Sequence, residues 1–146
     1  MVTKNILYLK KSNRSTIVKN LFQDEIEIDI MLDELLERVC LKDLTTLKGR
    51  IDAIKKVYHI HKYIPIYLTE DIILITVFNK KQIDNIYINT CNIIDMVKDN
   101  NKTIIVFLDR SQLIINKSYR LVKRYFDQSF KINKFWKEYK NGKEKY

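Results

Sequence analysis

Two pairs of side chains in the sequence have types and spacing that could do chemistry. His59 and His61 would share one face of a strand, where two imidazoles could begin a metal site, but a tetrahedral zinc site needs further ligands, which do not follow nearby. Asp33 and Glu37 lie one helical turn apart and resemble a catalytic carboxylate pair. No base, nucleophile or oxyanion donor completes that pair. We therefore expect a solvated helix face there, no catalytic residue, no bound metal and no cofactor.

The two cysteines, Cys40 and Cys91, have neither the spacing of a metal site nor the density of a secreted disulfide scaffold. We expect them to be apolar thiols in a reducing cytoplasm. The longest apolar runs, residues 6–9 and 72–78, are far shorter than the roughly twenty residues that cross a membrane. The sequence therefore predicts no signal peptide and no membrane span.

Positive charge is the strongest chemical signal in the chain. Twenty-seven lysines and arginines stand against eighteen aspartates and glutamates, which gives a net charge of +9 and favours a polyanionic partner such as nucleic acid or an anionic membrane surface. The tail from residue 119 is rich in lysine, arginine and aromatic residues, whereas residues 24–43 hold eight acids and two bases. Because the chain has only two glycines, it cannot form the glycine-rich phosphate-binding loops of P-loop or Rossmann enzymes.

The elements that must position these cations follow from the hydrophobic periodicity. Residues 5–30 alternate loosely and predict a small antiparallel meander. Apolar residues then recur every three or four positions, which predicts one helix over about 30–42 and a second one capped by Thr45 or Thr46. Pro65 requires the second helix to end before it and favours a strand or a strand edge.

The middle of the chain is rich in strands. The apolar run 72–78 predicts a central strand covered on both faces, and shorter strands are expected at 86–89, 91–97, 103–108 and 113–117. Helical spacing returns after residue 119. The predicted fold class is α+β, with a β-rich centre of short, mostly antiparallel strands, an N-terminal helical pair and a C-terminal basic helix, all in one domain over residues 1–146.

An ordered series of short motifs resembles the ComK family of competence transcription factors. In chain order these motifs are the helical Gly49-Arg50 after Cys40, the strand Ile64-Pro65-Ile66, the apolar run 72–78, the strand Thr103-Ile104-Ile105-Val106-Phe107 and the pair Ser118-Tyr119. No single motif is specific, but their order covers most of the chain. The resemblance implies a DNA-binding transcription factor rather than an enzyme.

This sequence departs from the family pattern at three places. Asn85-Ile86-Tyr87 stands where the family often has Cys-x-Trp, so the aromatic residue remains and the thiol is lost. Asp109-Arg110 replaces a tight Asn-Gly turn, which predicts a longer or differently built turn. After Ser118-Tyr119 the family's Gln and Arg do not line up, and a diverged DNA-contact surface is expected there.

What the resemblance implies is a transcription activator of the competence, or DNA-uptake, regulon. It would bind double-stranded AT-rich boxes through the minor groove as a homo-oligomer, with room for regulatory protein partners. Arg50 is expected to probe the groove. The predicted DNA contacts are Lys48, Arg50, Lys80, Lys81, Arg120, Lys123 and Arg124. The alternative is a basic protein-interaction module, or a diverged non-activating paralogue, that uses residues 24–43 as its contact.

Overall fold

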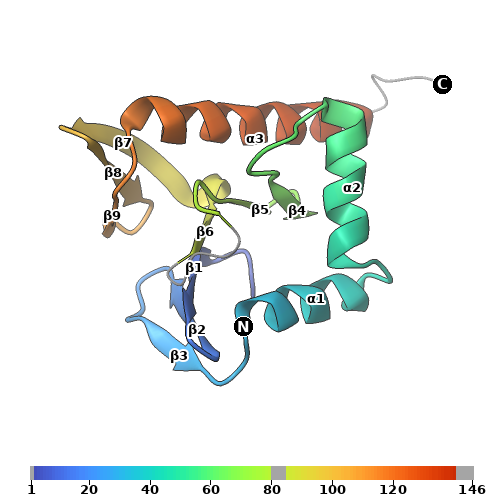
Figure 1. Cartoon of the computed structure of the whole chain (residues 1–146), viewed down its shortest axis with the longest axis horizontal. Helices are drawn as coiled ribbons and strands as arrows, with labels where there is room; N and C mark the ends of the chain where they lie inside the picture. Colours follow the sequence, from blue (N-terminus) through green and yellow to red (C-terminus); the bar gives the residue numbers. More distant parts are fainter. Residues whose placement is uncertain (1, 80–84, 141–146) are drawn as a thin grey trace.

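The computed structural model describes residues 2–79 and 85–140, except for the side chains of 135–137, 139 and 140. The described residues form three α-helices and nine strands (Figure 1). In chain order the elements are β1 (Ile6–Ser12), β2 (Ser15–Asn20), β3 (Ile26–Ile28), α1 (Leu32–Lys42), α2 (Leu47–Tyr58), β4 (Ile66–Thr69), β5 (Ile72–Ile75), β6 (Ile86–Asn89), the 3-10 helix η1 (Thr90–Asn92), β7 (Ile93–Asp99), β8 (Lys102–Phe107), β9 (Gln112–Ile115) and α3 (Tyr119–Lys140). The predicted α+β class is confirmed, with the helical pair placed after three strands.

The strands form two antiparallel sheets. The larger one has the order β3-β2-β1-β6-β5-β4, and the smaller one has the order β7-β8-β9. Strand β1 pairs with β6, with Leu9 opposite Tyr87, so the N-terminal meander is joined to the central strands. The sequence predicted the meander and the central strands separately. The pairing between them depends on residues nearly 80 positions apart, which local periodicity does not reveal.

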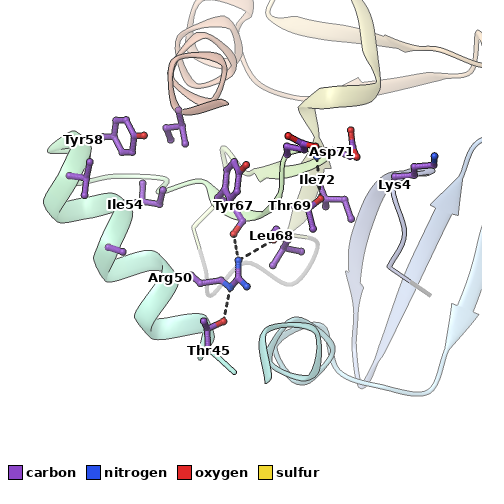
Figure 2. Close-up of a pocket in the computed structure, with 14 residues that line it drawn as sticks. Lys4, Thr45, Arg50, Ile54, Tyr58, Tyr67, Leu68, Thr69, Asp71 and Ile72 are labelled. Atoms are coloured by element: carbon purple, nitrogen blue, oxygen red, sulfur yellow. Dashed lines mark hydrogen bonds between the residues drawn. The ribbon is translucent and has the colours of Figure 1, made fainter. Parts of the chain in front are cut away.

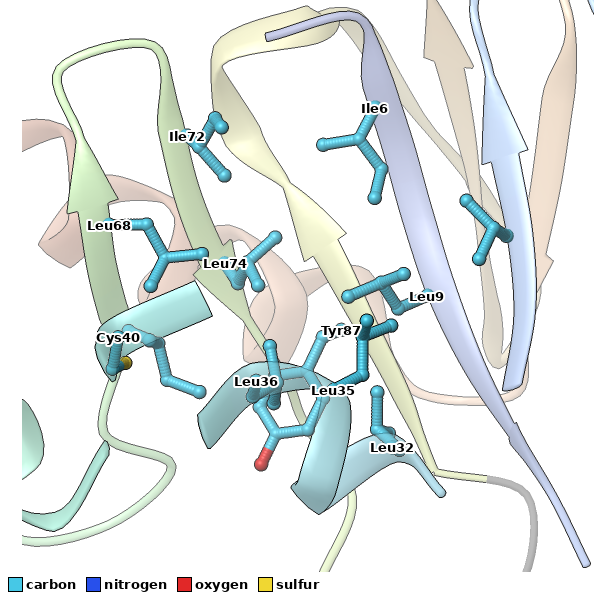
Figure 3. Packing of buried hydrophobic residues seen from close by; sticks show 12 residues of the cluster. Ile6, Leu9, Leu32, Leu35, Leu36, Cys40, Leu68, Ile72, Leu74 and Tyr87 are labelled. Carbon is cyan, nitrogen blue, oxygen red and sulfur yellow. The ribbon is translucent and has the colours of Figure 1, made fainter. Parts of the chain in front are cut away.

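The larger sheet is covered on both faces. Helix α1 packs Leu32, Leu35 and Leu36 against one face, where they meet Leu9 and Leu74 (Figure 3). The smaller sheet and α3 cover the opposite face through a second buried cluster. All four residues of β5 are buried, which confirms the predicted central strand.

Strand β5 ends at Ile75, earlier than the apolar run 72–78 suggested. The buried Thr76 hydroxyl donates to Asn85 Oδ1 at 2.6 Å and accepts from the Phe78 amide at 3.2 Å. These two side-chain contacts bend the backbone out of the ladder. The run therefore stays buried beyond the strand, since Val77 and Phe78 still lie in the core.

A fully buried asparagine organises the start of β7. Asn89 Oδ1 accepts from the amides of Ile73 at 3.1 Å and Cys91 at 3.3 Å, while Nδ2 donates to the carbonyls of Ile6 and Asp71. The contact with Cys91 caps η1, so β7 begins at Ile93 rather than at residue 91 as predicted. Four satisfied hydrogen bonds make this buried polar side chain compatible with the core.

The turn between β8 and β9 is built without glycine. Arg110 takes a left-handed φ of 72°, and its amide donates to the Phe107 carbonyl at 2.9 Å. The Asp109 carboxylate accepts from the amide and hydroxyl of Ser111 at 2.9 and 2.6 Å, and from the Phe22 amide at 3.0 Å. A four-residue connection replaces a two-residue hairpin. This turn matches the expectation that Asp109-Arg110 requires a different construction.

Candidate nucleic-acid interface

Helix α3 is anchored along one face and exposed along the other. Ser118 precedes its first residue, and the Ser118 hydroxyl oxygen accepts from the Leu121 amide at 3.3 Å, as N-capping serines do. Val122, Tyr125, Ser129 and Ile132 recur at helical spacing and are buried against the rest of the molecule. Because these residues fix the rotation of the helix about its axis, the residues between them must face solvent.

The solvent-facing side of α3 is predominantly basic. Four of its cations are exposed and Lys123 is half-buried. We define the cationic face of α3 as Arg120, Lys123, Arg124, Lys131 and Lys134. A shallow hollow of ≈ 750 Å³ runs along this face. Asp127 lies among the cations and pairs with Lys123 at 3.1 Å, with both side chains about half exposed.

The charge distribution at the start of α3 favours an external anion. The first turn, Tyr119 to Val122, contains no acid, and Arg120, Lys123 and Arg124 lie in the first two turns. A helix N-terminus carries a partial positive charge, so cations there cost about 0.3–1 kcal/mol each in the absence of an anion. A phosphate bound on this face would offset that cost through the cations and the helix dipole together.

An edge-to-face pair of tyrosines brings another cation toward α3. The Arg124 guanidinium lies 5.7 Å from the centre of the Tyr125 ring, and Tyr125 meets Tyr63 edge to face at 5.1 Å. Lys62, exposed in the loop after α2, lies 5.0 Å from the Tyr63 ring. The loop therefore adds positive charge beside the helix, over a rigid aromatic contact.

Arg50, predicted as a DNA contact, is held inside the fold (Figure 2). Its Nη1 donates to the carbonyls of Tyr67 at 2.7 Å and Leu68 at 3.1 Å, and its Nε donates to Thr45 Oγ1 at 2.8 Å. Nη2 pairs with Asp43 at 3.2 Å, and 16% of the side chain is exposed. Four hydrogen bonds join α2 to the α1–α2 turn and to the edge strand β4.

Gly49 is required for the way α2 begins. The Thr46 side chain caps the helix by accepting from the Gly49 amide at 2.9 Å, which confirms one of the two predicted caps. A Cβ at residue 49 would lie 2.9 Å from that same oxygen. Gly49 therefore allows the Thr46 cap to form, and Arg50 beside it connects α2 to β4 through hydrogen bonds.

The predicted DNA contacts fall into separate groups. Arg120, Lys123 and Arg124 lie together on α3, whereas Lys48 is exposed in the first turn of α2. Helix α2 and the residues directly after it meet α3 through Ile54, Ile60 and Ile132, near the C-terminal end of α2 (Figure 1). Lys48, in the first turn of α2, therefore lies at the other end of that helix. Lys80 and Lys81 lie outside the described residues.

Three cations near this site are not among the predicted DNA contacts: Lys131 and Lys134 on the cationic face of α3, and Lys62 beside the helix. Lys131 and Lys134 lie seven and eleven residues after Arg124 and Lys123, spacings that return to the same side of a helix. That periodicity was present in the sequence. Lys62 is different, since only the contact between Tyr63 and Tyr125 reveals its proximity to α3.

The other candidate groups considered in the sequence are the carboxylate of Glu37, the two histidines and the thiol of Cys40. Both Glu37 oxygens accept from the Leu47 amide, at 3.3 and 3.4 Å, so this carboxylate connects α1 to the start of α2. His59 ends α2 in the left-handed region and is exposed, as is His61. Burial raises the pKa of the Cys40 thiol, which lies on the buried side of α1 in the first core cluster. Within residues 2–79 and 85–140, no three histidine, cysteine or acidic side chains gather as metal ligands.

The fold and this site define a basic α+β protein that presents a cationic helix to solvent. The family model described as ComK protein matches residues 2–138 of the 146-residue chain. The protein therefore belongs to the ComK family, which is a family of competence transcription factors and not of enzymes. No curated protein and no solved structure matches the chain. In the part of the chain that the structure describes, no helix is long and apolar enough to span a bilayer.

Proposed function

We propose that this protein is a cytoplasmic, sequence-selective activator of competence genes that binds double-stranded DNA through the cationic face of α3. The observation that carries the proposal is the set of five cations on the outer side of a helix whose inner side is buried. These cations place positive charge on the solvent side of a rigid helix, where the backbone phosphates of a duplex have access to it. Family membership over residues 2–138 supports the same role.

Within this proposal, Arg120, Lys123 and Arg124 are the main backbone contacts. Lys48, Lys80 and Lys81 stay predicted contacts, and Arg50 acts chiefly by holding α2 in place. Selectivity for AT-rich boxes would come from arginines entering a narrowed minor groove. The function requires no cofactor, metal or catalytic residue. One domain over residues 1–146 would bind as a homo-oligomer, open to regulatory protein partners.

The test is a titration of the double variant Arg120→Ala/Arg124→Ala with AT-rich and GC-rich duplexes at one salt concentration. We expect at least a tenfold loss of affinity, since two charges leave the phosphate contacts. The matched control is Arg14→Ala/Lys42→Ala, which removes two exposed cations from other elements. Both variants are first checked for unchanged melting temperature. Equal losses in the two variants would contradict the assignment to α3, and wild-type protein without affinity for either duplex would contradict DNA binding itself.

A second candidate function rests on the acidic segment 24–43. Asp33 and Glu34 are exposed on α1, and Glu27 is exposed on the edge strand β3. An exposed acidic edge fits a basic protein partner better than DNA. Charge reversal at these positions, as in Asp33→Lys/Glu34→Lys, should leave a purely DNA-binding protein with unchanged or increased affinity. A loss of activation in cells with DNA affinity intact would favour the protein contact.

A further inference from the structure

A cavity of ≈ 810 Å³ lies between α2 and the edge strand β4 (Figure 2). Aliphatic side chains from four elements form its buried lining, and each is at most 8% exposed: Ile54 on α2, Leu68 on β4, Ile72 on β5 and Ile132 on α3. Small-molecule sites in proteins are typically concave, mainly apolar and of this size. The cavity therefore has the form of a ligand site, and the proposed DNA binding does not use it.

The α2 side of the cavity carries a small residue and an exposed aliphatic one. Ala53, the only alanine in the chain, lines the cavity one helical turn before Val57. Ala53 is exposed and Val57 is 58% exposed. An amphipathic helix normally turns such aliphatic side chains toward a core. An apolar occupant would remove this surface from water, which is favourable.

Two tyrosines supply hydroxyl groups to the cavity. Tyr58 extends from α2 toward Tyr67 on β4, and both side chains pack against the cluster that includes Ile54 and Ile132 (Figure 2). Burial raises the pKa of both phenols, so both stay uncharged at neutral pH. A phenol hydroxyl can donate and accept hydrogen bonds. The cavity therefore suits an apolar molecule that carries a hydroxyl or a carbonyl group.

The charged residues of the cavity favour neither an anion nor a cation. Two bases, Lys4 and Arg50, and two acids, Glu70 and Asp71, line it. Asp43 already pairs with Arg50 at 3.2 Å, which leaves one base against two acids and disfavours an anion. The net charge of +9 on the whole chain disfavours a cation. Because any ion also loses its hydration in an aliphatic cavity, we expect an uncharged ligand.

An extended peptide does not fit this place, although β4 is an edge strand. Strand addition needs the free backbone groups of the edge, and Arg50 Nη1 already donates to the Tyr67 and Leu68 carbonyls at 2.7 and 3.1 Å. We propose that the cavity binds one uncharged, mainly apolar small molecule. Its alkyl or aromatic body lies against the aliphatic lining, and its polar end meets the hydroxyls of Tyr58 and Tyr67.

The test is isothermal titration calorimetry of the full chain without DNA. The probes are 1-decanol, decylammonium and decanoate, which share one alkyl chain and differ in the charge of the head group. All three are kept below the concentrations at which they aggregate. We expect 1-decanol to bind once per chain with a dissociation constant on the order of 0.1 mM. The two ions should bind at least tenfold more weakly, because each loses hydration in the cavity.

Variants in the lining locate the binding. Ala53→Leu introduces a larger side chain into the cavity and should weaken 1-decanol binding at least tenfold, while leucine, a strong helix former, preserves α2. The matched control Ala53→Ser keeps a small side chain at the same position and should bind as the wild type does. Tyr58→Phe/Tyr67→Phe keeps both rings and should weaken 1-decanol binding about fivefold through the lost hydrogen bonds. Melting curves of all variants exclude unfolding as the cause.

Three results would overturn the proposal: no saturable binding of 1-decanol, binding of either ion as tight as that of 1-decanol, or an Ala53→Leu variant that binds like the wild type. Unchanged affinity in the tyrosine variant would overturn the placement of the polar end. Because DNA is absent, a protein that binds 1-decanol but no duplex would contradict only the proposed function. One that binds a duplex but no 1-decanol would contradict only this inference.

Discussion

Arg50 and Arg124 are arginines on amphipathic helices, and the structure gives them opposite environments. The Arg50 guanidinium donates to Thr45, Tyr67 and Leu68 and is largely withdrawn from solvent. Arg124 is exposed on the outer side of α3 and lies over the Tyr125 ring. A guanidinium whose donors are used within the fold stabilises that fold. One whose donors face solvent is available for a phosphate.

Positive charge in the sequence therefore does not by itself identify a binding surface. Both arginines follow the same pattern, a base off the apolar stripe of a helix. What separates them is the neighbouring edge strand, because β4 presents the Tyr67 and Leu68 carbonyls to α2, whereas the outer side of α3 faces solvent. Four predictions test this contrast.

The largest effect concerns the salt dependence of DNA binding. If the cationic face of α3 neutralises about four phosphates, affinity should fall on the order of a hundredfold between 50 and 200 mM salt. The Arg120→Ala/Arg124→Ala variant should lower the slope of log affinity against log salt by about 2, whereas Arg50→Ala should leave it unchanged. Titrations at several salt concentrations measure the slopes. Equal slopes in the two variants would contradict the claim that the arginines of α3, and not Arg50, contact the phosphates.

The second prediction is that Arg50→Ala lowers the free energy of unfolding by about 2–3 kcal/mol, because it removes charge-assisted hydrogen bonds between α2 and β4. Arg124→Ala should change it by less than about 0.5 kcal/mol. Urea denaturation of both variants measures the difference. Arg50→Lys should not restore the stability, since a lysine ammonium lacks the planar set of donors with which the guanidinium bonds Thr45 and the two β4 carbonyls at once. An Arg50→Ala variant of normal stability that loses its preference for AT-rich duplex would instead make Arg50 a direct DNA contact.

The contrast extends to two aspartates, Asp109 and Asp127. Burial alone would raise the pKa of Asp109, but hydrogen bonds from Ser111 and the Phe22 amide, together with Lys19 at 3.7 Å, outweigh it and lower this pKa to about 2. An unfolded aspartate has a pKa near 3.9. The folded value is lower, so the stabilisation is complete above about pH 4 and disappears as the pH falls toward 2.

We therefore expect Asp109→Asn to cost about 1–2 kcal/mol at neutral pH and to flatten the acid limb of the stability profile. Urea denaturation of the wild type and the variant at a series of pH values from 2 to 6 measures this. If the free energy of unfolding falls equally in the wild type and the variant below pH 4, Asp109 is not the source of this pH dependence.

The smallest effect concerns Asp127, which is exposed and pairs with Lys123. Asp127→Asn removes a negative charge from the cationic face and should raise DNA affinity about twofold to threefold, with unchanged stability. The matched control is Glu34→Gln, because Glu34 forms a similarly exposed pair with Arg38 on α1 at 2.7 Å. Glu34→Gln should leave DNA affinity unchanged. An increase of DNA affinity in both variants would indicate an effect of the net charge of the protein rather than of the position of Asp127 on α3.

Much of the fold follows from the chain alone, because it depends on local chemistry. Spacing of apolar residues gave both helices of the pair and the basic helix, and Thr46 was one of two predicted caps. Strand ends were less accurate. The positions where β5 stops and β7 starts depend on Thr76 and Asn89, whose partners lie on other elements. A side chain that bonds across the fold leaves no periodic signal.

For the candidate site, the sequence determined which helix carries the cations and which of its sides they occupy, because the buried residues of α3 repeat at the helical period. The tertiary structure decided which cations are available. Arg50 is engaged because β4 lies beside α2, and Lys62 joins α3 because Tyr63 packs on Tyr125. Likewise, only the packing of α2 beside β4 and α3 shows that Ala53, Leu68 and Ile132 line one cavity. Hydrogen bonding and packing between distant segments have no counterpart in local spacing, so the structure alone settles them.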